Sequence, residues 1–100
     1  MPEDNEEPED QAAHGTVELG NQIAEGYRDA DVWDIADGLL AGAIQYWLYS
    51  RQPCGDAQCQ GCAPLCTAEL RLDELKRACD ELARKSEYFH SPTDFDAGHA

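Results

Sequence analysis

The sequence predicts an all-α fold, a small three-helix arrangement built on a helical hairpin with a cysteine-rich connecting loop. Apolar side chains recur at steps of three and four residues within 29–52 and 68–88, the spacing that gathers them on one face of a helix. No stretch shows the alternation of apolar and polar residues that is typical of a half-buried strand. We therefore expect helices alone.

Length and composition set the extent of the folded part. The 100 residues allow one domain with one small core. The chain opens with MPEDNEEPED, whose acids and prolines cannot compensate the entropy lost on ordering, so residues 1–14 are expected to be a disordered acidic tail. Residues 15–90 are then the helical domain, and residues 91–100 a flexible C-terminal tail.

The first helix is expected over about Thr16–Gly26. Val17 and Ile23 supply apolar positions, and Gly20 interrupts the segment. This helix is expected to pack against the hairpin.

The second helix is strongly amphipathic. Asp29 or Asp31 can serve as its N-cap, and Pro53 stops it. Gly38 and Gly42 lie four residues apart, and each costs about 1 kcal/mol of helix propensity relative to alanine. We expect the flat strip of these two glycines to allow close approach of a neighbouring helix.

The third helix is expected over about Ala68–Tyr88, with Thr67 as its N-cap. One apolar stripe follows its length, with acid-to-base pairs at i,i+4 on the solvated face. The stripe comprises Leu72, Leu75, Cys79 and Leu82, and the pairs are Asp73–Arg77, Asp80–Arg84 and Glu81–Lys85.

Four cysteines lie in the connection between the two long helices, in the pattern Cys54-x4-Cys59-x2-Cys62-x3-Cys66. Four thiolates with no open position could hold a structural Zn²⁺. An ordinary loop with free thiols, or with a Cys54–Cys66 disulfide, is an alternative interpretation. The first three cysteines also match part of a plant-type [2Fe–2S] pattern, although the fourth ligand would lie too near. These three alternatives stay open.

Negative charge is concentrated in the first half of the chain. The net charge is −14, and residues 1–50 carry 12 acids against one base, Arg28. Such a field suits a basic partner, although a solvated helix face is the plainer interpretation of any acidic run. The candidate partner-binding residues are Glu25, Asp29, Asp31, Asp34 and Asp37 for charge, with Trp33 and Tyr49 as aromatic anchors.

Several functional classes are disfavoured. No nucleophile–base pair or phosphate-binding loop is apparent, so we expect no enzyme. Direct binding to nucleic acid is disfavoured because most of the few bases are predicted to pair with acids. The longest apolar run, Gly38–Tyr49, is too short to cross a bilayer, and the acidic N-terminus lacks a secretory signal. A cytoplasmic location is therefore expected.

The chain resembles small acidic inhibitors of phages and mobile elements. The resemblance rests on its length, its exposed aromatic residues and its acidic first half with Asp29, Asp31, Asp34 and Asp37. This class includes DNA mimics and the anti-CRISPR proteins that block type I complexes. The cysteine loop is not typical of it. The resemblance implies stoichiometric binding to a basic surface of a nucleic-acid-handling protein. The alternative is a zinc-stapled helical adaptor, for which the Gly38/Gly42 strip offers a surface for a homodimer.

Overall fold

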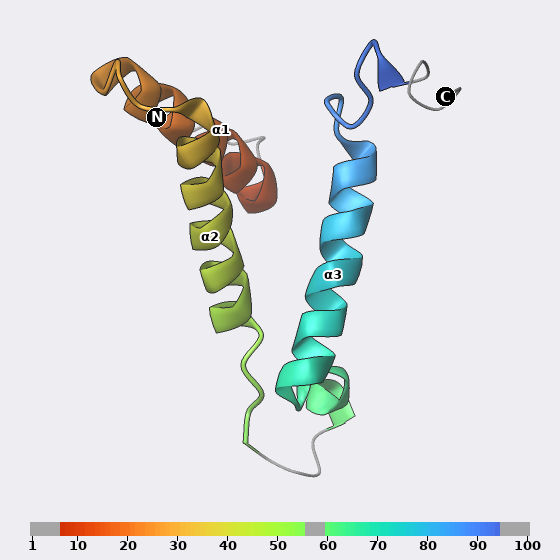
Figure 1. Cartoon of the computed structure of the whole chain (residues 1–100). Coiled ribbons are helices and arrows are strands. Elements are labelled where there is room, and N and C mark those ends of the chain that lie inside the picture. The colour runs from red at the N-terminus through yellow and green to blue at the C-terminus, as the bar shows by residue number, and fades with distance from the viewer. Residues whose placement is uncertain (1–6, 56–59, 95–100) are drawn as a thin grey trace. The chain divides into compact units, whose positions relative to one another are not determined.

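Helices make up all the regular structure of the computed structural model, which describes residues 7–55 and 60–94 (Figure 1). The elements are α1 (Pro8–Gly26), α2 (Val32–Ser50), the short 3₁₀ helix η1 (Gln60–Leu65) and α3 (Ala68–Lys85). No strand occurs among these described residues, so the predicted all-α class is confirmed. The chain divides into two compact units, residues 1–50 and 51–100, and each is considered by itself.

Helix α1 begins at Pro8, eight residues before the predicted start, and so includes part of the segment expected to be disordered. The local sequence explains this. Proline at the first helical position gives up an N–H that would have no partner there, and Glu9 and Asp10 place negative charge at the positive end of the helix dipole. The Gln11 N–H donates to the Glu7 carbonyl at 2.9 Å and closes the first turn.

The α1–α2 contact depends on a glycine of α1. A Cβ atom at Gly20 would lie 2.9 Å from Leu39 Cδ1, whereas Cβ atoms at Gly38 and Gly42 would meet nothing within 4 Å. Among the described residues of the first unit, α1 therefore does not approach the Gly38/Gly42 strip, and approach of any other helix to the strip stays a prediction. The close approach occurs at Gly20, where a side chain would separate the helices.

The start of α2 confirms Asp31 as its N-cap. The Trp33 N–H donates to Asp31 Oδ1 at 2.9 Å, and the Ile35 N–H donates to the Asp31 carbonyl at 3.1 Å. A side-chain oxygen here satisfies one of the N–H groups that has no partner within the helix. Asp29 lies instead in the preceding turn, where the Ala30 N–H donates to the Tyr27 carbonyl at 3.0 Å.

In the second unit, η1 leads into α3. The predicted cap at Thr67 is confirmed, since the Leu70 N–H donates to Thr67 Oγ1 at 3.1 Å. The Arg71 side chain donates to the Leu65 carbonyl at 2.9 Å and so joins α3 to η1. Helix α3 ends at Lys85, three residues earlier than predicted.

Two ion pairs form between exposed side chains of α3. Arg84 Nε lies 2.9 Å from Asp80 Oδ2, as predicted, whereas Arg77 pairs with Glu74 at i,i+3 and not with Asp73. No pair between Glu81 and Lys85 is found among the described residues. All four side chains of the two observed pairs are at least one-third exposed, so these pairs contribute little to stability.

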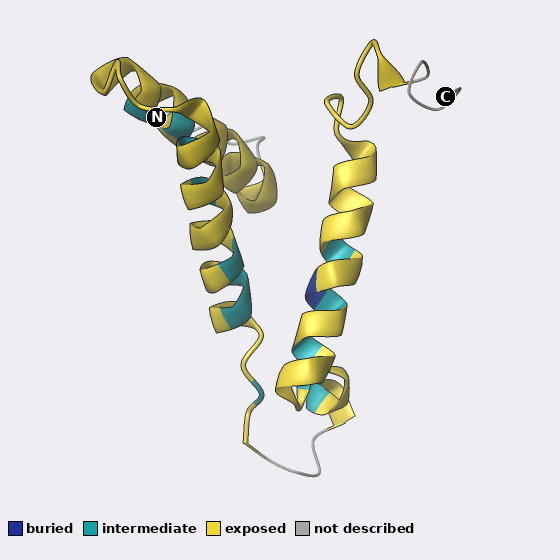
Figure 2. Cartoon of the chain, viewed as in Figure 1, coloured by how far each residue is buried: buried dark blue, intermediate teal, exposed yellow. Residues whose placement is uncertain are grey.

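Burial is shallow throughout the described residues (Figure 2). Leu75 is the one buried residue, at 9% exposure, and no side chain is fully buried among 7–55 and 60–94. The long helices α2 and α3 belong to different units, so their predicted pairing into a hairpin stays a prediction. No described helix combines the length and the apolar character needed to cross a membrane.

Candidate functional site

Exposed carboxylates surround the turn that joins α1 to α2. Five of them belong to the last turn of α1, the turn itself and the first half of α2, and we call this set the acidic corner: Glu25, Asp29, Asp31, Asp34 and Asp37. All are exposed, and no described carboxylate of residues 7–50 takes part in an ion pair. The corner therefore presents charge that the described chain leaves uncompensated.

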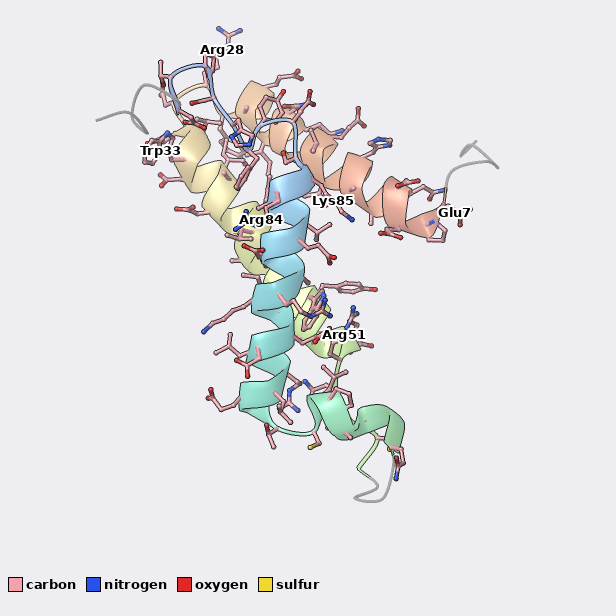
Figure 3. The ribbon with its side chains drawn as sticks, turned by 90° about the vertical axis from the view of Figure 1, so that its right-hand side faces the viewer. Glu7, Arg28, Trp33, Arg51, Arg84 and Lys85 are labelled. Atoms are coloured by element: carbon pink, nitrogen blue, oxygen red, sulfur yellow. The ribbon has the colours of Figure 1, made fainter. Side chains whose placement is uncertain are left out.

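Arg28 is the only base of the first 50 residues, and it lies in the same turn. Figure 3 shows its side chain extending outward from the turn, with Trp33 at the start of α2 nearby. No ion pair links Arg28 to the carboxylates of the described first unit. One exposed cation among five exposed acids reduces the local negative charge without cancelling it.

The members of the acidic corner differ in what else they do. One carboxylate oxygen of Asp31 accepts the hydrogen bond that caps α2. Asp34 lies in the first turn, where negative charge complements the helix dipole. Glu25 lies in the last turn of α1, which has no base, and a negative charge there opposes the dipole. Asp37 is past the first turn of α2, and its side chain makes no hydrogen bond to a described residue. Neither Glu25 nor Asp37 is explained by helix stability.

The structure separates the two aromatic anchors predicted from the sequence. Trp33 is 77% exposed and lies at the acidic corner. Tyr49 is 16 residues further along α2, which corresponds to roughly 24 Å and about 160° around the helix. Tyr49 therefore does not share a surface with Trp33.

Tyr49 belongs to a second exposed surface, at the C-terminal end of α2. Its ring lies 5.8 Å from that of Tyr46, centroid to centroid, at 40°. The two tyrosines line a shallow depression together with Gly42 and Gln45. The acidic corner gains other exposed apolar side chains that sequence reasoning missed, Tyr27 and Val32. The sequence places Tyr27 in the turn before α2 and Val32 directly after the Asp31 cap, and these positions could have indicated that both side chains lie beside the acidic residues.

The cysteine loop brings two of its thiol residues together. The Cys54 N–H donates to Cys62 Sγ at 3.4 Å, across eight residues of sequence, and Gly55 follows with a φ of 92° that favours glycine. No disulfide joins the described cysteines, Cys54, Cys62, Cys66 and Cys79, to one another. Cys59 lies outside the described residues, and within them no group of three metal-ligating side chains is assembled.

A short motif follows α3. The Ser91 N–H donates to Asp94 Oδ2 at 2.7 Å, and the Ser91 hydroxyl donates to Asp94 Oδ1 at 2.9 Å. Both hydrogen bonds lower the pKa of the Asp94 carboxyl, and the bond from the Ser91 N–H has the larger effect. The segment Ser91–Asp94 is thus locally organised, in part of the tail that was expected to be flexible.

The chain was compared with models of protein families, with curated proteins and with solved structures. None of the three comparisons finds a match. Function must therefore be inferred from the acidic corner and the cysteine loop themselves.

Proposed function

We propose that the first unit is a non-enzymatic inhibitor that binds a basic surface of a nucleic-acid-handling protein in the cytoplasm. One observation carries this proposal: the carboxylates of the acidic corner are exposed, and none forms an ion pair with a described residue. A protein that needs acids only for solubility gains nothing from excluding bases so completely from one half of its chain. A basic groove that binds a phosphate backbone offers the complementary charge.

The proposed interface combines charge with a few aromatic contacts. Trp33 and Tyr27 lie at the acidic corner and are 77% and 69% exposed, so they can be buried by a partner without rearrangement of the first unit. Aromatic side chains near the centre of an interface supply much of its affinity, and surrounding charges steer association. We assign no role in this surface to Tyr49.

The test is capture of a partner from a bacterial lysate on the immobilised full chain, eluted in steps of increasing salt. We expect a basic nucleic-acid-handling protein to be released at moderate salt, because exposed charges separated by more than about 8 Å are screened at 0.15 M. The same protein should be absent from a Glu25→Lys/Asp37→Lys bait. Neither residue caps a helix, and lysine at position 25 suits the end of α1.

The matched control is Asp73→Lys/Glu81→Lys in α3, which changes the net charge by the same amount. Both acids are exposed, and neither forms an ion pair within the part of the chain that the structure describes. This bait should retain the partner. Equal loss from both baits would show that only net charge matters, and retention by Glu25→Lys/Asp37→Lys would overturn the proposal.

We propose as a second role that the cysteine loop holds one structural Zn²⁺, as an adaptor stapled by metal would require. The proposal is favoured by the 3.4 Å hydrogen bond from the Cys54 N–H to Cys62 Sγ, since metal-bound sulfur atoms commonly accept such bonds. Cys66 and Cys59 would complete four thiolate ligands.

Native mass spectrometry of the purified chain tests this role. We expect one zinc per chain, lost in Cys62→Ser and retained in Cys79→Ser, because Cys79 lies in α3 away from the loop sequence. A wild-type chain that takes up no zinc would contradict it, as would the visible absorption of an iron–sulfur cluster.

A further inference from the structure

Helix α3 carries a regular apolar seam that neither proposed role uses. Its apolar residues recur alternately three and four positions apart, the heptad spacing of residues that meet a partner helix. The seam comprises Ala68, Leu72, Leu75, Cys79 and Leu82. Within the second unit, Leu75 is buried, but Leu72 and Leu82 are 38% and 65% exposed, so this unit leaves much of the seam able to accept a further contact.

The residues that flank this seam are mainly basic. In the heptad register set by the seam, the flanking positions carry Arg71, Lys76 and Lys85, against a single acid, Glu69. Ala78 and Ala83 fill the other flanking positions. The side chains of Arg84 and Lys85 extend from different sides of α3 (Figure 3). This fits a position of Lys85 beside the seam and of Arg84 away from it.

The acids of α3 gather on the opposite, outer face. Asp73, Glu74, Asp80 and Glu81 occupy outer positions, and the two outer arginines are already paired with Glu74 and Asp80. Lys76 and Lys85 have no recorded ion pair within the described residues. Sorting by charge therefore gives α3 a basic border around its apolar seam, although the chain as a whole is strongly acidic.

A second copy of α3 does not suit this border. In a parallel pair, Arg71 of one helix would face Lys76 of the other. In an antiparallel pair, Lys76 would face its own counterpart and Arg71 would face Lys85. Both orientations oppose like charges, which selects against self-pairing.

We propose that the α3 seam docks an amphipathic helix of another protein, one whose apolar stripe is flanked by aspartate or glutamate. Such a helix would bury Leu72 and Leu82 and place its acids opposite Lys76 and Lys85. Apolar seams supply affinity in this mode of recognition, and the flanking charges choose the partner. This inference is independent of the acidic corner, and it is an alternative to the predicted pairing of α2 with α3, in which α2 would cover the seam.

The test uses the full chain and a fluorescently labelled 21-residue peptide with leucine in the seam and glutamate at the flanking positions. Binding is followed by fluorescence anisotropy at 0.05 M and 0.5 M salt. We expect saturable binding that weakens with salt. Lys76→Gln/Lys85→Gln should weaken it at least fivefold at the lower salt.

The matched control is Arg77→Gln/Arg84→Gln, which removes the same charge from the outer face of the same helix. It should change the affinity by less than twofold, and the helix content of both variants is compared by circular dichroism. Equal weakening by the two variants, or no binding of the peptide to the wild-type chain, would overturn the proposal. So would a dimer of the full chain in sedimentation that Leu82→Lys abolishes, because it would assign the seam to a second copy.

Discussion

Replacing glycines with alanine in α1 and α2 tests the packing of the first unit most sharply. Alanine at Gly38 or Gly42 would meet nothing within 4 Å among the described residues of the first unit, so each substitution should add its helix propensity without a steric cost there. The expected gain is about 1 kcal/mol for each position. For a chain of this size, that gain raises the melting temperature by roughly 4–8 °C.

Alanine at Gly20 should behave differently. Its Cβ would lie 2.9 Å from Leu39 Cδ1 and 3.9 Å from Ile35 Cγ2, so the Leu39 methyl group must move. Overpacking costs about 1–3 kcal/mol, and the lower end applies because the atom met is the end of a flexible side chain. This cost roughly cancels the propensity gain. Gly20→Ala should therefore be less stable than Gly42→Ala by about 1 kcal/mol.

The assay is urea unfolding followed by far-ultraviolet circular dichroism, at two protein concentrations. A Gly20→Ala variant as stable as Gly42→Ala would refute the close approach of α1 to Leu39. A Gly42→Ala variant that destabilises the chain, more so at high concentration, would show that a second copy packs on the Gly38/Gly42 strip.

Other predictions concern the caps and the end of the chain. Asp31→Ala should lower the stability of α2 by about 1 kcal/mol, as loss of an N-cap does, and unchanged helicity would contradict the capping role. Thr67→Ala should cost α3 a similar amount, whereas Thr67→Ser should retain most of it. Because hydrogen bonds from Ser91 lower the pKa of Asp94, its stabilisation of the Ser91 turn is complete above the ordinary pKa of an aspartate and disappears as the pH falls through the lower pKa of the folded state. The Ser91 amide resonance should shift over that acidic range, and a shift centred near neutral pH would contradict the assignment.

The sequence predicted most where a local rule acts alone. The caps at Asp31 and Thr67 follow from residue type and position, and both are present. The early start of α1 was missed because the acids and prolines of the first ten residues predict disorder by composition, although Pro8 and the acids after it also favour a helix N-terminus. The composition of this segment predicts disorder, whereas the position of Pro8 and of the acids after it favours a helix N-terminus. The helix is what the structure shows.

Features that depend on contacts between helices could not be assigned from one sequence. Three glycines, Gly20, Gly38 and Gly42, carry the same propensity cost, and nothing local shows which one is approached closely. The separation of Trp33 from Tyr49, by contrast, was available from ideal helix geometry, because both were predicted to lie in one helix, 16 residues apart. The 3₁₀ turn η1 was missed because Gly61 and Pro64 indicated an irregular loop.

The sequence alone predicts that the acids lie on the surface, because aspartate and glutamate are rarely buried in folded proteins. Every described carboxylate of the first unit is exposed, as the composition indicated. Which of them serve binding was not readable. Asp31 combines a capping role with its charge, whereas Glu25 opposes the dipole of its own helix and so argues better for a functional role.

The central claim is that the acidic corner occupies a site otherwise used by nucleic acid. The most direct measurement is displacement of labelled duplex DNA from the captured partner by the wild-type chain and by Glu25→Lys/Asp37→Lys. Each reversed charge exchanges an exposed attraction for a repulsion, about 1 kcal/mol per site, so the variant should need roughly thirtyfold more protein for the same displacement at low salt. Equal displacement by the two proteins, or binding of the chain to the partner without loss of DNA, would contradict the account.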